Sequence, residues 1–429
     1  MDSRPDRRRL RRVLHAVSAS APRSRVSAQL ADRSLSDRGR ELASEAGAAA
    51  GVWEALNALS AQPGMINMGQ GFPDFEGSAV AKAAASAALR AGGPMGQYSP
   101  QPGLPALREA ISRFYNRQHG VVYDPATEVV VTAGAQEALA AIFLAYLDPG
   151  DEVLVFTPCY PFMLGAITLA GGVARAVTLQ SPDFAIEEQA VREMAAASPR
   201  LKMIVLNSPH NPTGHVVDED ELSMLADVCR ERDLIAIADD VYEYCLFPDS
   251  GRRHLRLADA EGMWDRTLTL CSGGKLFSLT GWRVAWAVGP AALMAPVGQA
   301  HSHLTFNAPT PLQAGIAAAL DAEGSAEAVA EVGALYGENF KKLRHALLAG
   351  TTARSVCAAQ GGFFLVAETD GTPDVEWAAR LAEEKHVVGT PMSVFYSTPF
   401  PEEAPCTLVR FTVCKSAEHI DRACAALLG

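Results

Sequence analysis

Residues 201–242 read LKMIVLNSPHNPTGHVVDEDELSMLADVCRERDLIAIADDVY and carry the clearest architectural signal in the chain. The apolar runs Met203–Leu206 and Leu234–Ala238 have the length and β-branched content of buried strands. Between them, Glu219–Arg232 has the apolar period of a helix. A strand, a helix and a second strand in this order form a crossover unit with parallel strands. We therefore predict an α/β protein with a large, doubly wound, mainly parallel sheet.

The alternation of strand and helix continues on both sides of this unit. Further buried strands are predicted at 129–132, 152–156 and 267–270, with helices at 136–147 and 162–170. A long helical stretch after Asn307 leads to strand-like residues at 363–366 and 408–412, which predict a second, smaller αβ domain. We therefore expect a large domain at 76–309, a small C-terminal domain at 310–429, and an N-terminal arm at 41–75 that joins the small domain.

The first forty residues differ from the rest, because arginine is frequent among them and acidic residues are few. We expect residues 1–40 to form a disordered tail or a segment resembling an organellar transit peptide. The protein is then expected in the cytoplasm, or in a mitochondrial or plastid matrix if this segment is a transit peptide.

Composition limits the classes of partner. The 429 residues include 49 acidic and 37 basic side chains, a net charge of −12 that disfavours nucleic acid or an anionic membrane as the main partner. Eight scattered cysteines without a CxxC pair indicate reduced thiols. The longest apolar candidate for a membrane span, residues 153–174, is interrupted by Pro158 and Pro161.

Polar loops follow four of the predicted strands, at the edge where a doubly wound sheet binds its ligand. The first, Thr132–Glu137 (TAGAQE), turns into a helix whose free backbone N–H groups suit a phosphate. The second, Asn207–Gly214 (NSPHNPTG), holds Asn211 between two prolines, a rigid setting that aims its amide into the cleft. Both segments also fit a plainer interpretation as ordinary turns.

The other two loops carry charged side chains. Asp239 directly follows a buried strand, where a carboxylate needs a partner such as a protonated ring nitrogen, although it could instead cap the next helix. Ser272–Arg283 (SGGKLFSLTGWR) flanks Lys275 with an open backbone, so that its amine can reach a carbonyl group. Ser272 and Arg283 offer donors to a phosphate. A lone lysine in a loop, however, is usually solvated.

Taken together, the four loops supply a phosphate cradle, a partner for a ring nitrogen, donors to a phenolic oxygen and an amine nucleophile. These are the requirements of pyridoxal 5'-phosphate. The set therefore predicts an enzyme in which Lys275 is the catalytic residue and carries this cofactor as a Schiff base.

Longer strings in the same order resemble the class I aminotransferases of fold type I, over roughly residues 50 to 425. Within that family the chain looks most like the branch of kynurenine/glutamine aminotransferases and N-succinyldiaminopimelate aminotransferases. The resemblance rests on INMGQGFPDF, GQYSPQPGLPALREAI, SPHNPTG, DDVYE, SGGKLFSLTGWR, GGFFLVA, PMSVFY and VRFTVCK.

The resemblance implies a role for each matching residue around the cofactor. Lys275 forms the Schiff base, Asp239 pairs with the pyridine nitrogen, and Tyr160 stacks on the ring. The phenolic oxygen accepts from Asn211 and Tyr242. The phosphate is held by Ala135, Gln136, Ser272 and Arg283, with Tyr98 contributed across a homodimer interface.

The resemblance also implies a substrate pocket. Arg410 grips the α-carboxylate bidentately, and Gly71 and Asn211 line that part of the pocket. The substrate side chain is bordered by Trp53, and by Phe306 and Asn307 of the other subunit. The apolar rings predict glutamine, methionine, aromatic amino acids or kynurenine as better donors than aspartate.

The implied reaction moves an amino group from an amino acid to a 2-oxo acid with ping-pong kinetics. N-succinyldiaminopimelate transamination, β-elimination from cysteine S-conjugates, and a cyclising or synthase reaction stay open, because the cofactor residues are the same. Gln136 and Asn307 depart from the kynurenine-type enzymes, which tend to have an aromatic residue and a histidine there. Asp240 stands where glutamate is usual, a change that should leave Asp239 untouched.

Other chemistries fit the sequence less well. His301 and His303 have a metal-like spacing, but no third ligand cluster accompanies them, so we expect no metal and a structural role. No nucleophile-elbow string is present, and Gly69 and Gly71 do not open a helix, which disfavours a dinucleotide site.

Overall fold

The structure is a computed structural model that describes residues 36, 38–40, 53–396 and 406–429. The arginine-rich segment through residue 35, and residues 41–52 of the predicted arm, lie outside the described residues. Residues 53–60 of that arm are helical. Among the helices that the structure describes, none is long and apolar enough to span a membrane.

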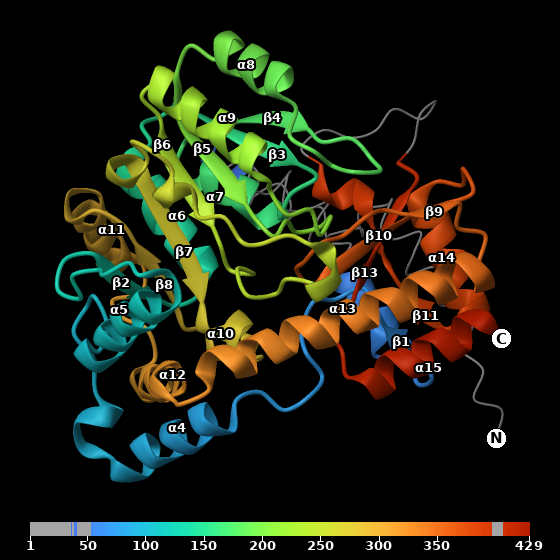
Figure 1. The fold of residues 1–429 in the computed structure, drawn as a ribbon, viewed down its shortest axis with the longest axis horizontal. Coiled ribbons are helices and arrows are strands. Elements are labelled where there is room, and N and C mark those ends of the chain that lie inside the picture. The colour runs from blue at the N-terminus through green and yellow to red at the C-terminus, as the bar shows by residue number, and fades with distance from the viewer. Residues whose placement is uncertain (1–35, 37, 41–52, 397–405) are drawn as a thin grey trace, which may run out of the picture.

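The largest sheet has seven strands in the order β2-β8-β7-β6-β5-β3-β4 (Figure 1). Only β8 is antiparallel to its neighbours, β2 and β7, so the predicted mainly parallel sheet is confirmed. The strands are β2 (Val129–Thr132), β3 (Glu152–Thr157), β4 (Val173–Thr178), β5 (Leu201–Asn207), β6 (Ile235–Asp239), β7 (Thr267–Ser272) and β8 (Ala285–Val288).

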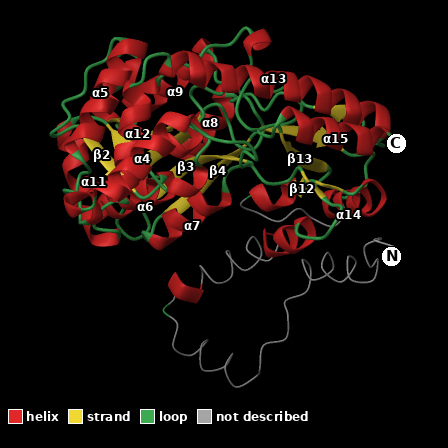
Figure 2. Ribbon diagram, turned by 90° about the horizontal axis from the view of Figure 1, so that it is seen from below, coloured by secondary structure: helices red, strands yellow, loops and turns green. Residues whose placement is uncertain are grey.

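Alternate residues of the central strands pack on opposite faces of this sheet. Val153 and Val155 of β3 join one apolar cluster, and Leu154 and Phe156 join another. Helices α6 (Ala135–Tyr146), α7 (Pro161–Leu169) and α11 (Ala291–Leu304) cover the first face, whereas α8 (Glu188–Ala197) and α9 (Glu219–Glu231) cover the second (Figure 2). Burial on both faces explains why these strands are continuous apolar runs.

Three further helices pack beside β2 and β8. They are α4 (Ala79–Ala91), α5 (Pro105–His119) and α12 (Thr310–Asp321), and they share an apolar cluster with these strands. The long helical stretch predicted after Asn307 is two helices, α12 and α13 (Ser325–Gly350). Figure 1 shows α13 running from beside α12 to the smaller sheet, where it packs against α15 (Ala417–Leu428).

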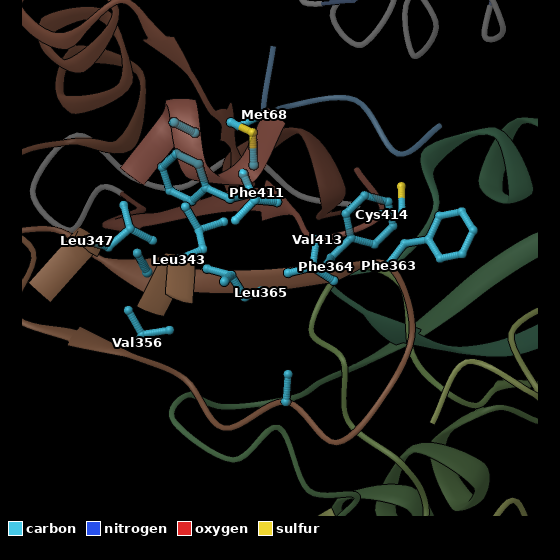
Figure 3. Close-up of a cluster of buried hydrophobic side chains, with 14 of the residues drawn as sticks. Met68, Leu343, Leu347, Val356, Phe363, Phe364, Leu365, Phe411, Val413 and Cys414 are labelled. Atoms are coloured by element: carbon cyan, nitrogen blue, oxygen red, sulfur yellow. The ribbon is translucent and has the colours of Figure 1, made fainter. Parts of the chain in front are cut away.

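The C-terminal part contains a four-stranded antiparallel sheet in the order β12-β13-β10-β9. Its strands are β9 (Ser355–Val356), β10 (Phe364–Glu368), β12 (Thr390–Pro391) and β13 (Leu408–Thr412), with α14 (Asp374–Lys385) beside them. Short β1 (Ile66–Asn67) pairs with β11 (Val387–Val388), which ties the segment before α4 to this part. Figure 3 shows its apolar core, in which Leu365 and Phe411 lie near Leu343 and Leu347 of α13, while Phe364 lies beside Val413 and Cys414.

Candidate active site

Strand register brings the four polar loops to one edge of the large sheet. Asn207 and Asp239 are paired positions at the ends of β5 and β6, and Asp239 pairs in turn with Leu270 of β7. Thr132 and Ser272, the last residues of β2 and β7, both pair with Ala285 of β8. All four loops that the sequence singled out therefore meet at the same edge.

The amino terminus of α6 and Arg283 form a cationic corner at this edge. Gly134 caps α6 with a φ of 101°, and a side chain there would collide with Arg283, whose Nη2 lies 2.1 Å from the ideal Cβ position. Glycine thus allows the guanidinium to lie against the first turn of the helix, where unbonded N–H groups favour an anion. Ser272, largely buried, lies two strands away across β8.

Gln136 links this corner to the next helix. Its Nε2 donates to the carbonyl of Phe162 at 2.9 Å, whereas its Oε1 is buried and has no hydrogen-bond partner in the part of the chain that the structure describes. The amide of Gln136 is thus engaged at the first turn of α7, so its backbone N–H and that of Ala135 are the groups that suit a phosphate.

Lys275 lies in the short helix α10 (Gly273–Leu276), directly after β7. Its Nζ is 4.7 Å from the centroid of the Phe363 ring and 5.3 Å from that of the Tyr242 ring. No described carboxylate lies within ion-pair distance of it. Desolvation lowers the pKa of this amine, which favours the neutral, nucleophilic form.

Asp239 lines a cavity with a carboxylate that has an unused acceptor. The cavity wall consists of Phe156, Cys159, Tyr160, Met163, Val205, Asn207, His210, Asn211 and Asp239. The Oδ1 of Asp239 is buried without a hydrogen-bond partner among the described residues. Desolvation, with a smaller contribution from Asp240, raises the pKa of Asp239 to about 7. A cation or an N–H donor in this cavity would offset the cost of burying the ionised Asp239 carboxylate.

Asn207 organises the strand end around Asp239. Its Nδ2 donates to the Asp239 carbonyl at 2.7 Å, and its Oδ1 accepts from the backbone N–H of Asn211 at 2.8 Å. It thereby fixes the loop that presents the Asn211 side chain. Asn207 is the first residue of the string NSPHNPTG, whose pattern alone indicates no role for its side chain.

Arg410, on β13, is a buried cation held by neutral partners. It is only 2% exposed, and it donates to Asn211 Oδ1 at 3.0 Å and to the Gly69 carbonyl at 2.8 Å. Its Nε has no partner, and no carboxylate among the described residues forms an ion pair with it. Desolvation disfavours the charged guanidinium and lowers its pKa to about 9. A substrate carboxylate bound beside it would stabilise the charged form again.

Aromatic rings surround the Arg410 guanidinium. Its Cζ lies 3.8 Å from the centroid of Phe364, 4.4 Å from that of Phe395 and 5.7 Å from that of Trp53. A side chain at Gly71 would enter the Phe364 ring, since its ideal Cβ falls 2.3 Å from Cζ of that phenylalanine. Phe364 and Phe395 escaped the sequence analysis, although both stand in the quoted strings GGFFLVA and PMSVFY.

Tyr98, Phe306 and Asn307 form a separate group on the surface of the chain. The Tyr98 side chain is 80% exposed, and its ring packs edge-to-face on Phe306 with centroids 5.2 Å apart. Asn307 Nδ2 donates to the Ser99 carbonyl at 3.1 Å. Within one chain Tyr98 and Phe306 contact each other and Asn307 bonds to the residue after Tyr98, and among the described residues none of the three forms a hydrogen bond or ring contact with Lys275 or Arg410.

A buried polar cluster lies directly behind the Asp239 strand end. Asp240 Oδ2 is 3.2 Å from His254 Nε2, and Glu243 accepts from Tyr115 Oη at 2.8 Å and from Cys271 Sγ at 3.1 Å. Burial raises the pKa of Glu243 to about 7. Asp240, which departs from the usual glutamate of the family, is thus engaged away from the cavity.

The fold and these side chains define a mainly parallel α/β enzyme whose site combines a helix amino terminus, a partly buried lysine and a buried arginine. A family model described as aminotransferase class I and II matches residues 63–427. The chain therefore belongs to the class I and II aminotransferase family. Its members use pyridoxal phosphate in general, and this protein is an aminotransferase of fold type I.

Individual relatives agree with this membership. A probable N-succinyldiaminopimelate aminotransferase of Mycobacterium tuberculosis is 39% identical over 87% of this chain and 94% of its own length. A kynurenine–oxoglutarate transaminase of Dictyostelium discoideum is 32% identical over 87% and 92%. The structure of the N-succinyldiaminopimelate aminotransferase from Mycobacterium tuberculosis superimposes with a TM-score of 0.81 at 38% identity, covering 88% of this chain and 96% of that chain.

Proposed function

We propose that this aminotransferase binds pyridoxal phosphate at the carboxyl edge of the large sheet, with Lys275 as the residue that bonds to the cofactor's carbonyl carbon. The lysine amine adds to that carbon and one water molecule leaves. The lowered pKa of Lys275 supports this role, because only the neutral amine can attack.

The observation that carries the proposal is the unpartnered Oδ1 of Asp239. A buried carboxylate without a partner is costly, and the pyridinium N–H of the cofactor is a donor of the right charge. The neighbouring Tyr160 would then cover the ring face, since both residues line the same cavity. Asn211 and Tyr242 would donate to the phenolic oxygen.

The phosphate end of the cofactor fits the cationic corner. Ala135 and Gln136 offer backbone N–H groups, Arg283 offers its guanidinium, and Ser272 offers a hydroxyl. The clash that a Cβ at Gly134 would make with Arg283 supports this assignment, because glycine keeps the cradle open.

The bound cofactor supplies an electron sink for the bond that breaks at the substrate Cα. Asp239 keeps that sink effective by holding the ring nitrogen protonated. Arg410 would orient the substrate by its α-carboxylate, and the freed amine of Lys275 would move the proton between Cα and the adjoining cofactor carbon. One water molecule would release the 2-oxo acid while the amino group stays with the bound cofactor, and a second 2-oxo acid would then take up that amino group with loss of one water molecule.

The preferred donors in this proposal have long neutral side chains: glutamine, methionine, aromatic amino acids or kynurenine. Trp53, Phe364 and Phe395 surround Arg410 with apolar rings, which gain from burial of such side chains. A short acidic side chain would lose its hydration there, because this proposal assigns the Arg410 guanidinium to the α-carboxylate.

A second candidate donor is N-succinyldiaminopimelate, favoured by the 39% identity to the probable N-succinyldiaminopimelate aminotransferase. Gln136 and Asn307 also differ from the residues typical of the kynurenine-type enzymes. A panel of these donors with one 2-oxo acid acceptor separates the two proposals, and analysis for released ammonia and pyruvate separates both from β-elimination of cysteine conjugates.

We further propose a homodimer in which Tyr98 and Phe306 complete the partner's site. The exposure of both rings on the single chain supports this, because apolar rings on a surface commonly mark an interface. The proposed small C-terminal domain is supported by the packing of α13 on α15. Helix α12, which the proposed boundary at residue 309 assigns to that domain, packs instead on α4 and α5, so we place the end of the large domain after Asp321.

Borohydride reduction of the purified protein followed by peptide mapping tests the cofactor proposal. We expect a phosphopyridoxyl mass on the peptide that contains Lys275, and loss of the visible absorbance. A reduced adduct on another lysine, or a Lys275→Ala protein that keeps the absorbance and the adduct, would reject the assignment.

A further inference from the structure

A buried glutamate–histidine pair lies next to the cationic corner and takes no part in the proposed chemistry. Glu137 is the third residue of α6, and its Oε2 accepts from the backbone N–H of Ala133 at 3.0 Å. Both of its oxygens lie 3.0 Å from Nδ1 of His301, a fully buried residue of α11. Glu137 therefore joins the turn before α6 to a helix far along the chain.

The second ring nitrogen of His301 faces another acceptor. Its Nε2 lies 3.0 Å from the carbonyl oxygen of Gln101, which can only accept. Nε2 must therefore donate, and Nδ1 shares a proton with the Glu137 carboxylate.

Gln101 belongs to the segment 97–104, which contains Tyr98 and which side chains from the α11–α12 region hold in place. Thr310 Oγ1 donates to the Gln97 carbonyl at 2.7 Å, and Gln313 Nε2 donates to Ser99 Oγ at 3.1 Å. Gln313 Oε1 accepts from the N–H of Leu104 at 2.7 Å. His301 is the member of this set that also reaches the turn of α6, through Glu137.

Because glycine caps α6, the hydrogen bond from the Ala133 N–H to Glu137 is important for the position of the turn. Gly134 has no side chain with which to bond the first turn, and its left-handed φ is set by the surrounding structure. The carboxylate of Glu137 therefore supplies the side-chain bond that fixes the turn at Ala133. Loss of that bond would let the N–H groups of Ala135 and Gln136 drift from the position that Arg283 shares.

We propose that Glu137 and His301 are positioning residues that hold the phosphate-binding turn and the Tyr98 segment in one fixed relation. The same pair then sets how the turn grips the cofactor phosphate and how Tyr98 is presented to the partner subunit. This inference rests on the proposed function, because it takes the turn of α6 as the phosphate site and Tyr98 as a residue of the interface.

The test compares His301→Phe and Glu137→Gln with His303→Gln, a matched control two residues along α11 on an exposed position. Glu137→Gln keeps an acceptor for Ala133 and an amide for a neutral histidine, so it removes the charge with little change of shape. Each protein is made cofactor-free and titrated with pyridoxal phosphate. The dissociation constant, the ³¹P signal of the bound phosphate, and the amide exchange of residues 97–104 and 133–136 are measured.

We expect His301→Phe to raise the dissociation constant at least tenfold, to shift the ³¹P signal, and to speed exchange in both segments. Glu137→Gln should cause a smaller change in the same direction, and His303→Gln should match the wild type. Unchanged affinity and exchange in both His301→Phe and Glu137→Gln would overturn the proposal. Faster exchange in only one segment would overturn the coupling. Borohydride reduction of the wild type tests the proposed function separately. If it gave no adduct on Lys275, the proposed function itself would be wrong, whatever the variants showed.

If the His301→Phe protein does not fold, the Glu137→Gln protein alone tests the proposed positioning role. A dissociation constant and a ³¹P signal equal to those of the wild type would then reject the proposal, and a weaker affinity with a shifted signal would support it.

Discussion

Replacing Arg410 with glutamine should abolish most of the enzyme's selectivity for substrates that carry an α-carboxylate. The guanidinium has five N–H donors, and bonds to Asn211 and Gly69 account for two of them. The remaining three can donate to a substrate carboxylate, in a site where Arg410 is only 2% exposed. A charge-assisted hydrogen bond to such a group contributes about 1.5–3 kcal/mol, so a bidentate pair contributes roughly 3–6 kcal/mol.

This loss of free energy lowers kcat/KM for methionine by between about a hundredfold and about twenty-thousandfold, at 1.4 kcal/mol for each factor of ten. The assay measures kcat/KM for methionine and, in parallel, the rate with 3-methylthiopropylamine, which is methionine without its carboxylate. The amine should react equally slowly with the wild type and with Arg410→Gln. Arg354→Gln, which changes an exposed arginine bonded to the Asp370 carbonyl, is the control.

A loss below about tenfold for methionine, with cofactor absorbance retained, would refute the assignment of Arg410 as the carboxylate partner. An equal loss for methionine and for the amine would refute it as well, because the effect would then come from disturbance of the site. Arg410→Lys should fall between the two proteins, since it keeps the charge and loses the paired donors.

Further predictions concern the cofactor site, the dimer, the substrate and stability. Asp239→Ala should weaken cofactor binding and slow proton abstraction at Cα by several orders of magnitude, whereas Asp240→Ala should be much milder; stopped-flow spectra that rank them the other way would contradict the Asp239 assignment. Mixing Lys275→Ala subunits with Tyr98→Phe, Phe306→Ala subunits should restore part of the activity, and a fully active monomer by light scattering would contradict the shared site. With one acceptor, kcat/KM for methionine or glutamine should exceed that for aspartate, and a ratio below one would overturn the apolar pocket. Because the pKa of Asp239 is raised to about 7 from 3.8, the stability it contributes in the protonated form is complete below pH 3.8 and is lost as the pH rises through 7. The cofactor-free Asp239→Asn protein should therefore melt several degrees above the cofactor-free wild type at pH 8 and near it at pH 4, and equal melting temperatures at pH 8 would contradict the burial penalty.

Much of the large sheet could be predicted from sequence because its strands are buried on both faces. Five predicted strands agree with β2, β3, β5, β6 and β7 to within two residues at either end, since continuous β-branched runs leave little ambiguity. Strand β4 is not predicted, because exposed residues and Arg175 break its apolar run. Strand β8 is not predicted either, because its four buried residues AWAV form too short a run to be distinguished from part of a helix by pattern.

In the candidate active site, the residues that directly follow strands could be predicted from sequence, whereas contacts between distant segments could not. Asp239, Lys275 and Asn211 follow strands directly, so parallel topology alone predicts that they meet. Phe395 reaches Arg410 through packing between segments far apart in sequence, and no local pattern reports such a contact. The hydrogen bonds of His301 to Glu137 and Gln101 also join segments far apart in sequence. The sequence around His301 therefore indicates a structural role without indicating which residues it contacts.

Incubating the cofactor-loaded enzyme with methionine and no acceptor would measure the first half of the reaction by itself. We predict release of one equivalent of the 2-oxo acid per subunit, conversion of the visible absorbance, and recovery of both on adding a second 2-oxo acid. The Lys275→Ala protein should release almost none over the same time. Continuous release beyond one equivalent without an acceptor, or full release by Lys275→Ala, would contradict a ping-pong transamination that depends on this lysine.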